Sequence, residues 1–157
     1  MQRVCLAVLR FSLSAWVGIA IFFVMVILDL RHSELFDRSV KFNHPKVLFP
    51  LYYGFAFSLL GVAFVCALAG LWDATARAVL RCARVALVGA ALGIAVVDYL
   101  FIYRPLADML AVPEIPAARF VMYHEKSRLL NGAVLGASVL AAVTALWPEM
   151  SQKPEPT

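Results

Sequence analysis

Three polar residues with a helical spacing occur late in this chain, at His124, Arg128 and Asn131. Positions i, i+4 and i+7 fall on one face of an α-helix, so the three side chains would project together. Asp98 stands near the end of an earlier apolar stretch, where an ionised carboxylate needs a cation or water. Arg128 is the expected cation, with Asn131 bridging the two. This arrangement predicts either an ion pair that locks two helices or a polar pocket for a small solute.

Two further polar residues belong to the same candidate pocket, Asp29 and His44. Asp29 lies at a depth in the first apolar stretch similar to that of Asp98, and His44 precedes the second stretch. Histidines near one membrane face can bind copper or another transition metal. No two of the three histidines have the i, i+3 or i, i+4 spacing of a helical chelate, so the metal ligands stay unassigned.

Enzyme motifs and cofactor motifs give no catalytic residue. The HExxH, GxSxG, GxGxxG and Walker patterns are missing from the chain. The three cysteines form no CxxC pair, which argues against a zinc ribbon or a covalently attached haem. A membrane haem needs histidines inside the helices, and no apolar stretch has one in its interior. No cofactor is predicted, and haem and copper are kept as alternatives.

The composition decides which kind of element must position these residues. The chain has 157 residues, of which 63% are hydrophobic and 15% are charged. A soluble protein is nearer half apolar and a quarter charged, and one core of this size could not bury so much apolar surface. The sequence therefore predicts an integral membrane protein whose partner is the lipid bilayer. The net charge of +4 comes from basic residues spread along the chain, which excludes a nucleic-acid-binding patch.

Four apolar stretches are long enough to cross a bilayer, which takes about 20 helical residues. They predict an all-α, four-helix transmembrane bundle with both termini on the same side of the membrane. The second and third stretches are joined by a tight turn, whereas the loops Arg31–Lys46 and Arg104–Arg119 are longer, and the proline-containing second one is expected to be irregular. The polar tail 148–157 is expected to be disordered. The spans cover about 4–30, 47–72, 78–103 and 118–147.

Several residues indicate the orientation of the bundle in the membrane and the faces through which its helices pack. Arg3 and Arg10 flank the first span, and a basic cluster fills the tight turn, which favours cytoplasmic termini in a bacterial inner (plasma) membrane. We expect the guanidinium of Arg10 to reach back to the lipid headgroups. Small-residue faces allow close helix contact inside the bundle or in a homodimer or larger membrane complex. They are Gly89/Gly93, Gly132/Gly136 and Gly54/Ser58/Gly61, and the expected interfacial anchors are Trp72, Tyr103 and Trp147.

Three segments resemble a known family. Trp16–Phe23 and Leu48–Tyr53 resemble the transmembrane protein 205-like family, and Phe120–Asn131 is similar to its His-x-x-Ser-x-x-x-Asn stretch. The resemblance implies a four-helix membrane protein, distantly like the membrane domain of copper-resistance protein D, with an unsettled biochemical role. The proline expected after the first span is missing from Val26–Phe36. The family's motif positions correspond here to Trp16, Gly18, Phe49, Pro50, Tyr52, His124, Ser127 and Asn131.

Three functional classes are compatible with these features. The first is a non-enzymatic accessory or small-solute or metal-handling component with a polar pocket at one membrane face, as the resemblance implies. The second is a redox membrane protein associated with haem or quinone. The third is a structural scaffold subunit of a membrane complex.

Overall fold

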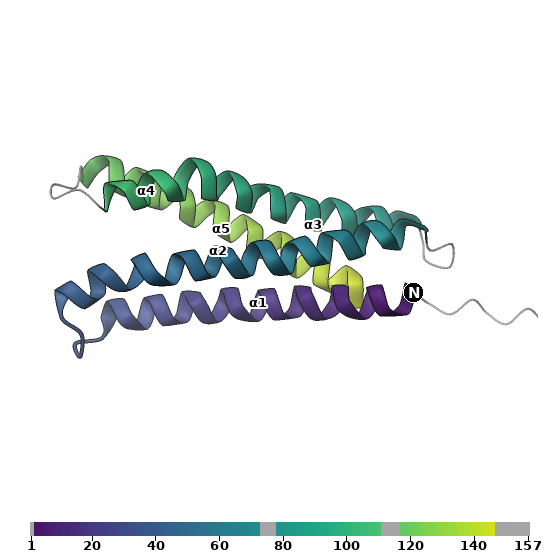
Figure 1. The fold of residues 1–157 in the computed structure, drawn as a ribbon, viewed down its shortest axis with the longest axis horizontal. Helices are drawn as coiled ribbons and strands as arrows, with labels where there is room; N and C mark the ends of the chain where they lie inside the picture. Colours follow the sequence, from purple (N-terminus) through teal and green to yellow (C-terminus); the bar gives the residue numbers. More distant parts are fainter. Residues whose placement is uncertain (1, 73–77, 111–116, 147–157) are drawn as a thin grey trace, which may run out of the picture.

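Four long helices form an antiparallel bundle (Figure 1). The computed structural model describes residues 2–72, 78–110 and 117–146, and these contain no β-strand. Each of four helical segments is long and apolar enough to cross a membrane: Arg3–His32, Ser39–Trp72, Ala78–Met109 and Ala118–Leu146. The predicted all-α, four-helix membrane bundle is therefore confirmed. The expected tail 148–157 and the expected anchor Trp147 lie outside the described residues.

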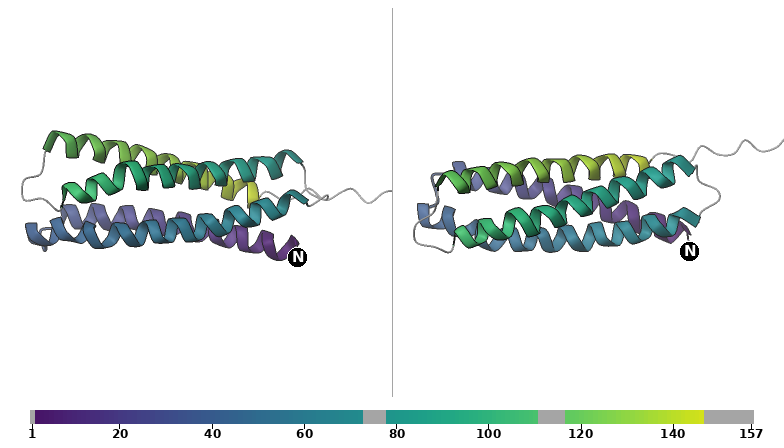
Figure 2. Two further views of the ribbon diagram at one scale, coloured as in Figure 1. Left: turned by 45° about the horizontal axis from the view of Figure 1, so that its top comes forward. Right: turned by 90° about the horizontal axis from the view of Figure 1, so that it is seen from above.

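Neighbouring helices surround a common core in the order α1 (Gln2–His32), α2 (Arg38–Ala69), α3 (Ala78–Asp98) and α5 (Ala117–Leu146). The most extensive contacts join α1 to α2 and α3 to α5, while α2–α3 and α1–α5 close the ring. The beginning of α1 and the end of α5 lie at the same end of the bundle in all three views (Figures 1 and 2). We call this the N-terminal end and the other the opposite end. The prediction that both termini lie on one side is confirmed for the described chain.

The helices extend beyond the apolar stretches at the opposite end. Helix α2 begins at Arg38 rather than near Val47, so the expected loop before the second span shrinks to the residues between His32 and Arg38. Pro45 and Pro50 lie inside α2 without ending it, although each removes one backbone hydrogen bond. Hydropathy marks the membrane-spanning part of a helix and misses polar turns that project from it.

The third span is also longer than expected. A π-helical turn, Tyr99–Tyr103, follows α3 and leads directly into the short helix α4, Arg104–Met109. The segment expected to begin an irregular loop at Arg104 is therefore helical. Pro105 lies directly after the π-helical turn, at the start of α4.

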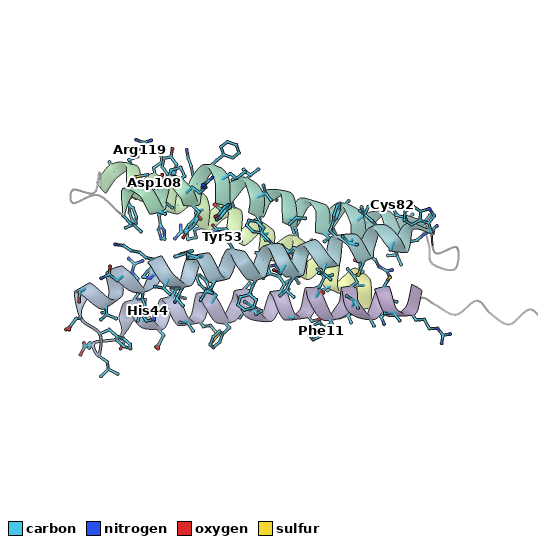
Figure 3. All side chains as sticks on the ribbon, viewed as in Figure 1. Phe11, His44, Tyr53, Cys82, Asp108 and Arg119 are labelled. Carbon is cyan, nitrogen blue, oxygen red and sulfur yellow. The ribbon has the colours of Figure 1, made fainter. Side chains whose placement is uncertain are left out.

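The core consists of residues spaced alternately three and four positions apart, as expected for packed helices. Outside this core, large apolar side chains face away from the bundle, where lipid would surround them. Phe11 is 71% exposed and points outward from α1 in Figure 3, and Leu129 is 75% exposed. The buried residues that follow this spacing include Leu9, Leu13, Trp16 and Ala20 of α1; Tyr53, Ala56, Leu60, Ala63 and Ala67 of α2; Val88, Ala91 and Ala95 of α3; and Val134, Ser138, Ala141 and Ala145 of α5.

The small residues that bring the helices together are mostly alanines. Among the glycines, a Cβ at Gly89 would lie 3.1 Å from the ring of Phe64, so α2 and α3 approach closely there. A Cβ at Gly93, Gly132 or Gly136 would meet nothing within 4 Å, and these three glycines are exposed on the outside of the bundle. The same holds for a Cβ at Gly54 and Gly61. Internal packing through glycine faces is thus wrong except at Gly89.

Replacing Ala141 with leucine should lower the free energy of unfolding by about 1–3 kcal/mol, because the extra methyl groups overfill a closed interface. Ala141 has 0% of its surface exposed. The matched control is Gly136→Leu on the same helix, which points outward and should lose no stability, because leucine has the higher helix propensity. Unfolding in mixed detergent micelles, followed by circular dichroism, measures both. Equal losses in the two variants would contradict the alanine interface, and a loss of dimer in Gly136→Leu would place a homodimer contact there.

Candidate functional site

Asp98 lies at the centre of a buried hydrogen-bond network that joins three helices. Its side chain is 0% exposed at the end of α3. Oδ2 accepts hydrogen bonds from Tyr53 Oη of α2 at 2.5 Å, and from Asn131 Nδ2 and Ser127 Oγ of α5 at 2.6 and 3.2 Å. Oδ1 is buried and has no hydrogen-bond partner among the described residues. Three donors on one carboxylate oxygen compensate much of the cost of burying it.

A second layer of hydrogen bonds holds the donors in place. Tyr52 Oη donates to Asn131 Oδ1 at 2.9 Å. The side-chain amide of Asn131 therefore links Tyr52 of α2 to Asp98 of α3. Asn131 Nδ2 also lies 2.9 Å from the Ser127 carbonyl oxygen one helical turn earlier. We call the five residues Tyr52, Tyr53, Asp98, Ser127 and Asn131 the Asp98 network. Figure 3 shows Tyr53 on the side of α2 that faces α3 and α5.

Helix α1 joins the network through Trp16. The Trp16 ring is 0% exposed and packs on Tyr52 with 5.2 Å between ring centroids. Its Nε1 donates to Ser138 Oγ on α5 at 3.1 Å, and Ser138 in turn donates to the Val134 carbonyl at 2.7 Å. All four long helices are therefore tied together at this level of the bundle by polar atoms as well as by packing.

The π-helical turn after Asp98 packs tyrosines against Tyr53. Tyr99 and Tyr103 lie 5.1 and 4.8 Å from the Tyr53 ring centroid, and Tyr103 stacks on Phe49 at 5.8 Å. Such turns occur frequently at functional sites because they displace side chains from the regular helical register. Tyr103, expected as an interfacial anchor, belongs to this aromatic cluster.

The expected ion pair between Asp98 and Arg128 is not formed among the described residues. Asn131 faces Asp98 as predicted, but Arg128 is exposed and Ser127 takes the inward position. Ser127 and Arg128 lie four and three positions before Asn131, so either residue can share a helix face with Asn131. Which of the two points inward depends on the rotation of the helix about its axis, which the sequence does not specify. The inward face of α5 runs through Ser127, Asn131, Val134, Ser138, Ala141 and Ala145.

The other predicted pocket residues lie outside this network. His124, Asp29 and His44 are all exposed near the opposite end of the bundle. No group of three histidine, cysteine, aspartate or glutamate side chains suited to a metal ion occurs in residues 2–72, 78–110 and 117–146. The structure therefore brings together Asp98 and Asn131, and leaves His124, Arg128, Asp29 and His44 apart from them.

A cavity of about 540 Å³ opens at the opposite end, where the α1–α2 pair draws apart from α4 and α5 (Figure 1). We call it the end pocket. Phe49 and Tyr103 line it and also belong to the aromatic cluster around Tyr53, so the pocket wall and the Asp98 network share a border. The remaining lining residues are Ile27, Leu30, Arg31, Lys41, Pro45, Lys46, Leu106, Ala107, Leu110, Phe120 and His124.

Comparison of the chain with protein-family models, with curated proteins and with solved structures gives no match. Membership of the transmembrane protein 205-like family therefore stays a prediction. The positions that suggested it separate into three groups in the structure. Trp16, Tyr52, Ser127 and Asn131 lie in or against the Asp98 network, and Phe49 and His124 line the end pocket, whereas Gly18 and Pro50 are exposed.

Sequence reasoning missed one residue of the site and a pair of polar contacts at the N-terminal end of the bundle. Tyr53 donates the shortest hydrogen bond to Asp98, and the only signal for it was a pair of adjacent tyrosines in an uncharged span. At the N-terminal end, two arginines bind the last carbonyls of α5. Arg84, 6% exposed, donates to the Thr144 oxygen at 3.0 and 3.2 Å, and Arg10 donates to the Ala145 oxygen at 2.8 Å. Cations at a helix C-terminus satisfy carbonyls that lack helical partners. The guanidinium of Arg10, expected to reach the headgroups, binds a backbone carbonyl at this end of the bundle.

Proposed function

We propose that this protein is a non-enzymatic membrane component that binds a small solute in the end pocket, at one face of the membrane. The observation that carries the proposal is the pocket itself. Its volume of about 540 Å³ falls within the range of about 300–1,000 Å³ typical of small-molecule sites. Its walls are apolar with a few convergent polar groups, which is the usual composition of such sites.

The neighbouring polar network supports the same proposal. Residues of α1, α2, α4 and α5 line the pocket, so its shape depends on how these helices are held relative to one another. The Asp98 network fixes α2, α3 and α5, and Trp16 attaches α1 to them. A pocket whose walls are already held in place loses less conformational entropy when a ligand binds. The network therefore acts as the support of the pocket and the pocket as the binding site.

Filling the pocket provides the test. Ala107 lines it, and Ala107→Trp should displace a bound molecule by overpacking, a cost of about 1–3 kcal/mol or roughly ten- to a hundredfold in affinity. Native mass spectrometry of the protein released from mild detergent would count the molecules retained. We expect one retained small molecule in the wild type and its loss in Ala107→Trp.

Val121→Trp is the matched control, because Val121 is 55% exposed at the same end of the bundle and does not line the pocket. It should retain the bound molecule as the wild type does. No retained molecule in the wild type, or equal retention in both tryptophan variants, would refute solute binding at the end pocket.

A further inference from the structure

The charged side chains that line the end pocket, among the described residues, are all basic. Arg31 near the end of α1 and Lys41 and Lys46 in the early turns of α2 line it, and His124 of α5 lies on the other wall. Among the described lining residues there is no aspartate or glutamate. Three cations beside one cavity create a positive potential, which low-dielectric walls strengthen.

The cations and the apolar lining occupy different parts of the pocket. Arg31 and Lys46 are exposed and Lys41 is half-buried, so the charges lie toward the outside. Leu30 and Leu106 are each only 8% exposed and provide the inner apolar wall, together with Ile27, Phe49 and Phe120. The pocket is therefore amphipathic, with a cationic rim and a hydrocarbon-like interior.

One hydrogen bond positions a cation at the rim. Lys41 Nζ donates to the Arg31 carbonyl at 3.3 Å, which places its ammonium beside the last turn of α1. An ammonium has three donors, so two remain for a ligand. Hydrogen bonds from Lys or Arg to carboxylate or phosphate oxygens are about twice as strong as those between neutral groups.

We propose that the end pocket takes an anionic amphiphile, a molecule with a hydrocarbon body and a single carboxylate or phosphate headgroup. This inference rests on the proposed binding of a solute in the same pocket. The hydrocarbon body lies against Leu30, Leu106 and Phe120, and the headgroup lies between Arg31, Lys41 and Lys46. Basic pockets between membrane helices are a common way of binding acidic lipid headgroups.

Other ligand classes fit the lining less well. A cationic solute would meet three like charges at the rim. A neutral hydrocarbon would fill the interior but gain nothing from the positive potential at the rim, which an anion gains at the edge of a low-dielectric medium. A metal ion would find no carboxylate or thiolate among the described lining residues.

Binding of charge-matched probes tests the inference. Dodecyl phosphate, the uncharged analogue dodecyl glycerol and phosphatidylglycerol would each be titrated onto the full-length protein in nonionic detergent, with native mass spectrometry as the readout. We expect dodecyl phosphate to bind at least about tenfold more tightly than dodecyl glycerol, and the difference to shrink with salt. Competition between dodecyl phosphate and phosphatidylglycerol distinguishes a free single-chain anion from a bilayer lipid as the source of the headgroup.

The decisive variant is Lys41→Gln/Lys46→Gln, which removes two charges and keeps most of the side-chain length. It should lose the preference for phosphate and still bind dodecyl glycerol. The matched control is Arg119→Gln/Lys126→Gln, which removes two exposed cations of α5 that do not line the pocket and should keep the preference.

The outcomes separate this inference from the proposed function. Equal binding of dodecyl phosphate and dodecyl glycerol to the wild type, both lost in Ala107→Trp, would overturn the anionic class and leave solute binding intact. An equal loss of preference in both double variants would also overturn it, because net charge rather than the rim would then be responsible. No binding of any of the three probes would overturn both proposals.

Discussion

Asp98→Ala should lower the free energy of unfolding by about 2–4 kcal/mol. Tyr53, Ser127 and Asn131 would each lose their acceptor on Oδ2. Hydrogen bonds inside membrane proteins average about 0.6 kcal/mol, which gives about 2 kcal/mol for the three. The rest of the range comes from buried donors left without any partner, because they can no longer reach water. Asp98→Asn keeps an acceptor oxygen and should cost less.

The measurement is unfolding of the purified protein by increasing mole fractions of sodium dodecyl sulfate in dodecyl maltoside micelles. Asp29→Ala is the matched control, since Asp29 is an exposed aspartate near the same end of the bundle and should change stability by less than about 0.5 kcal/mol. A double-mutant cycle with Tyr53→Phe should reveal coupling, because the two side chains share a 2.5 Å hydrogen bond.

The same cycle with Arg128→Ala decides between the two descriptions of Asp98. The structure leads us to expect additive effects within about 0.3–0.5 kcal/mol, as for residues without a shared partner. Strong coupling between Asp98 and Arg128 would instead support the ion pair predicted from the spacing of the polar residues. It would also show that α5 is rotated relative to the arrangement described here.

Four spans and the importance of Asp98 could be predicted from the sequence because both depend on the cost of charge in lipid. Long uncharged stretches are the direct signature of a bilayer crossing, and an aspartate within one of them requires a partner. The identity of that partner could not be predicted. It depends on the rotation of α5 about its axis, and Ser127 and Arg128 are adjacent in sequence. Hydropathy contains no information at that resolution.

The helix faces that turn inward could not be predicted from the sequence for a similar reason. Glycine and alanine both permit close approach of helices, so a small-residue pattern does not say which face turns inward. The glycines at 132 and 136 face outward, and Ala141 and Ala145 face inward on the same helix. The contacts of Arg10 and Arg84 with α5 depend on which helices are neighbours. The end pocket depends on the helical extension of α2 toward Arg38, in a segment that hydropathy assigned to a loop.

Trp16→Ala should have the largest effect of any single substitution considered, a loss of about 3–5 kcal/mol, as for other buried tryptophans replaced by alanine. Trp16 is 0% exposed, and its ring fills the space where α1, α2 and α5 meet beside Tyr52. Its removal leaves a cavity that lipid cannot fill and leaves Ser138 Oγ without its donor. The loss would be measured by circular dichroism in the same micelle titration.

Two companion variants separate the contributions to that loss. Trp16→Phe keeps an aromatic ring in the core and removes the Nε1 donor, so it should cost about 1–2 kcal/mol, the part due to the hydrogen bond and the smaller ring. Trp72→Ala is the matched control at an exposed tryptophan, 79% accessible at the end of the second span, and should cost less than about 1 kcal/mol. A loss in Trp72→Ala equal to that in Trp16→Ala would contradict the central position of Trp16.

Because the Trp16 ring contacts Tyr52, and Tyr52 donates to Asn131, the stability losses of Trp16→Ala and Asp98→Ala should also be non-additive. Full additivity would mean that α1 is anchored independently of the Asp98 network.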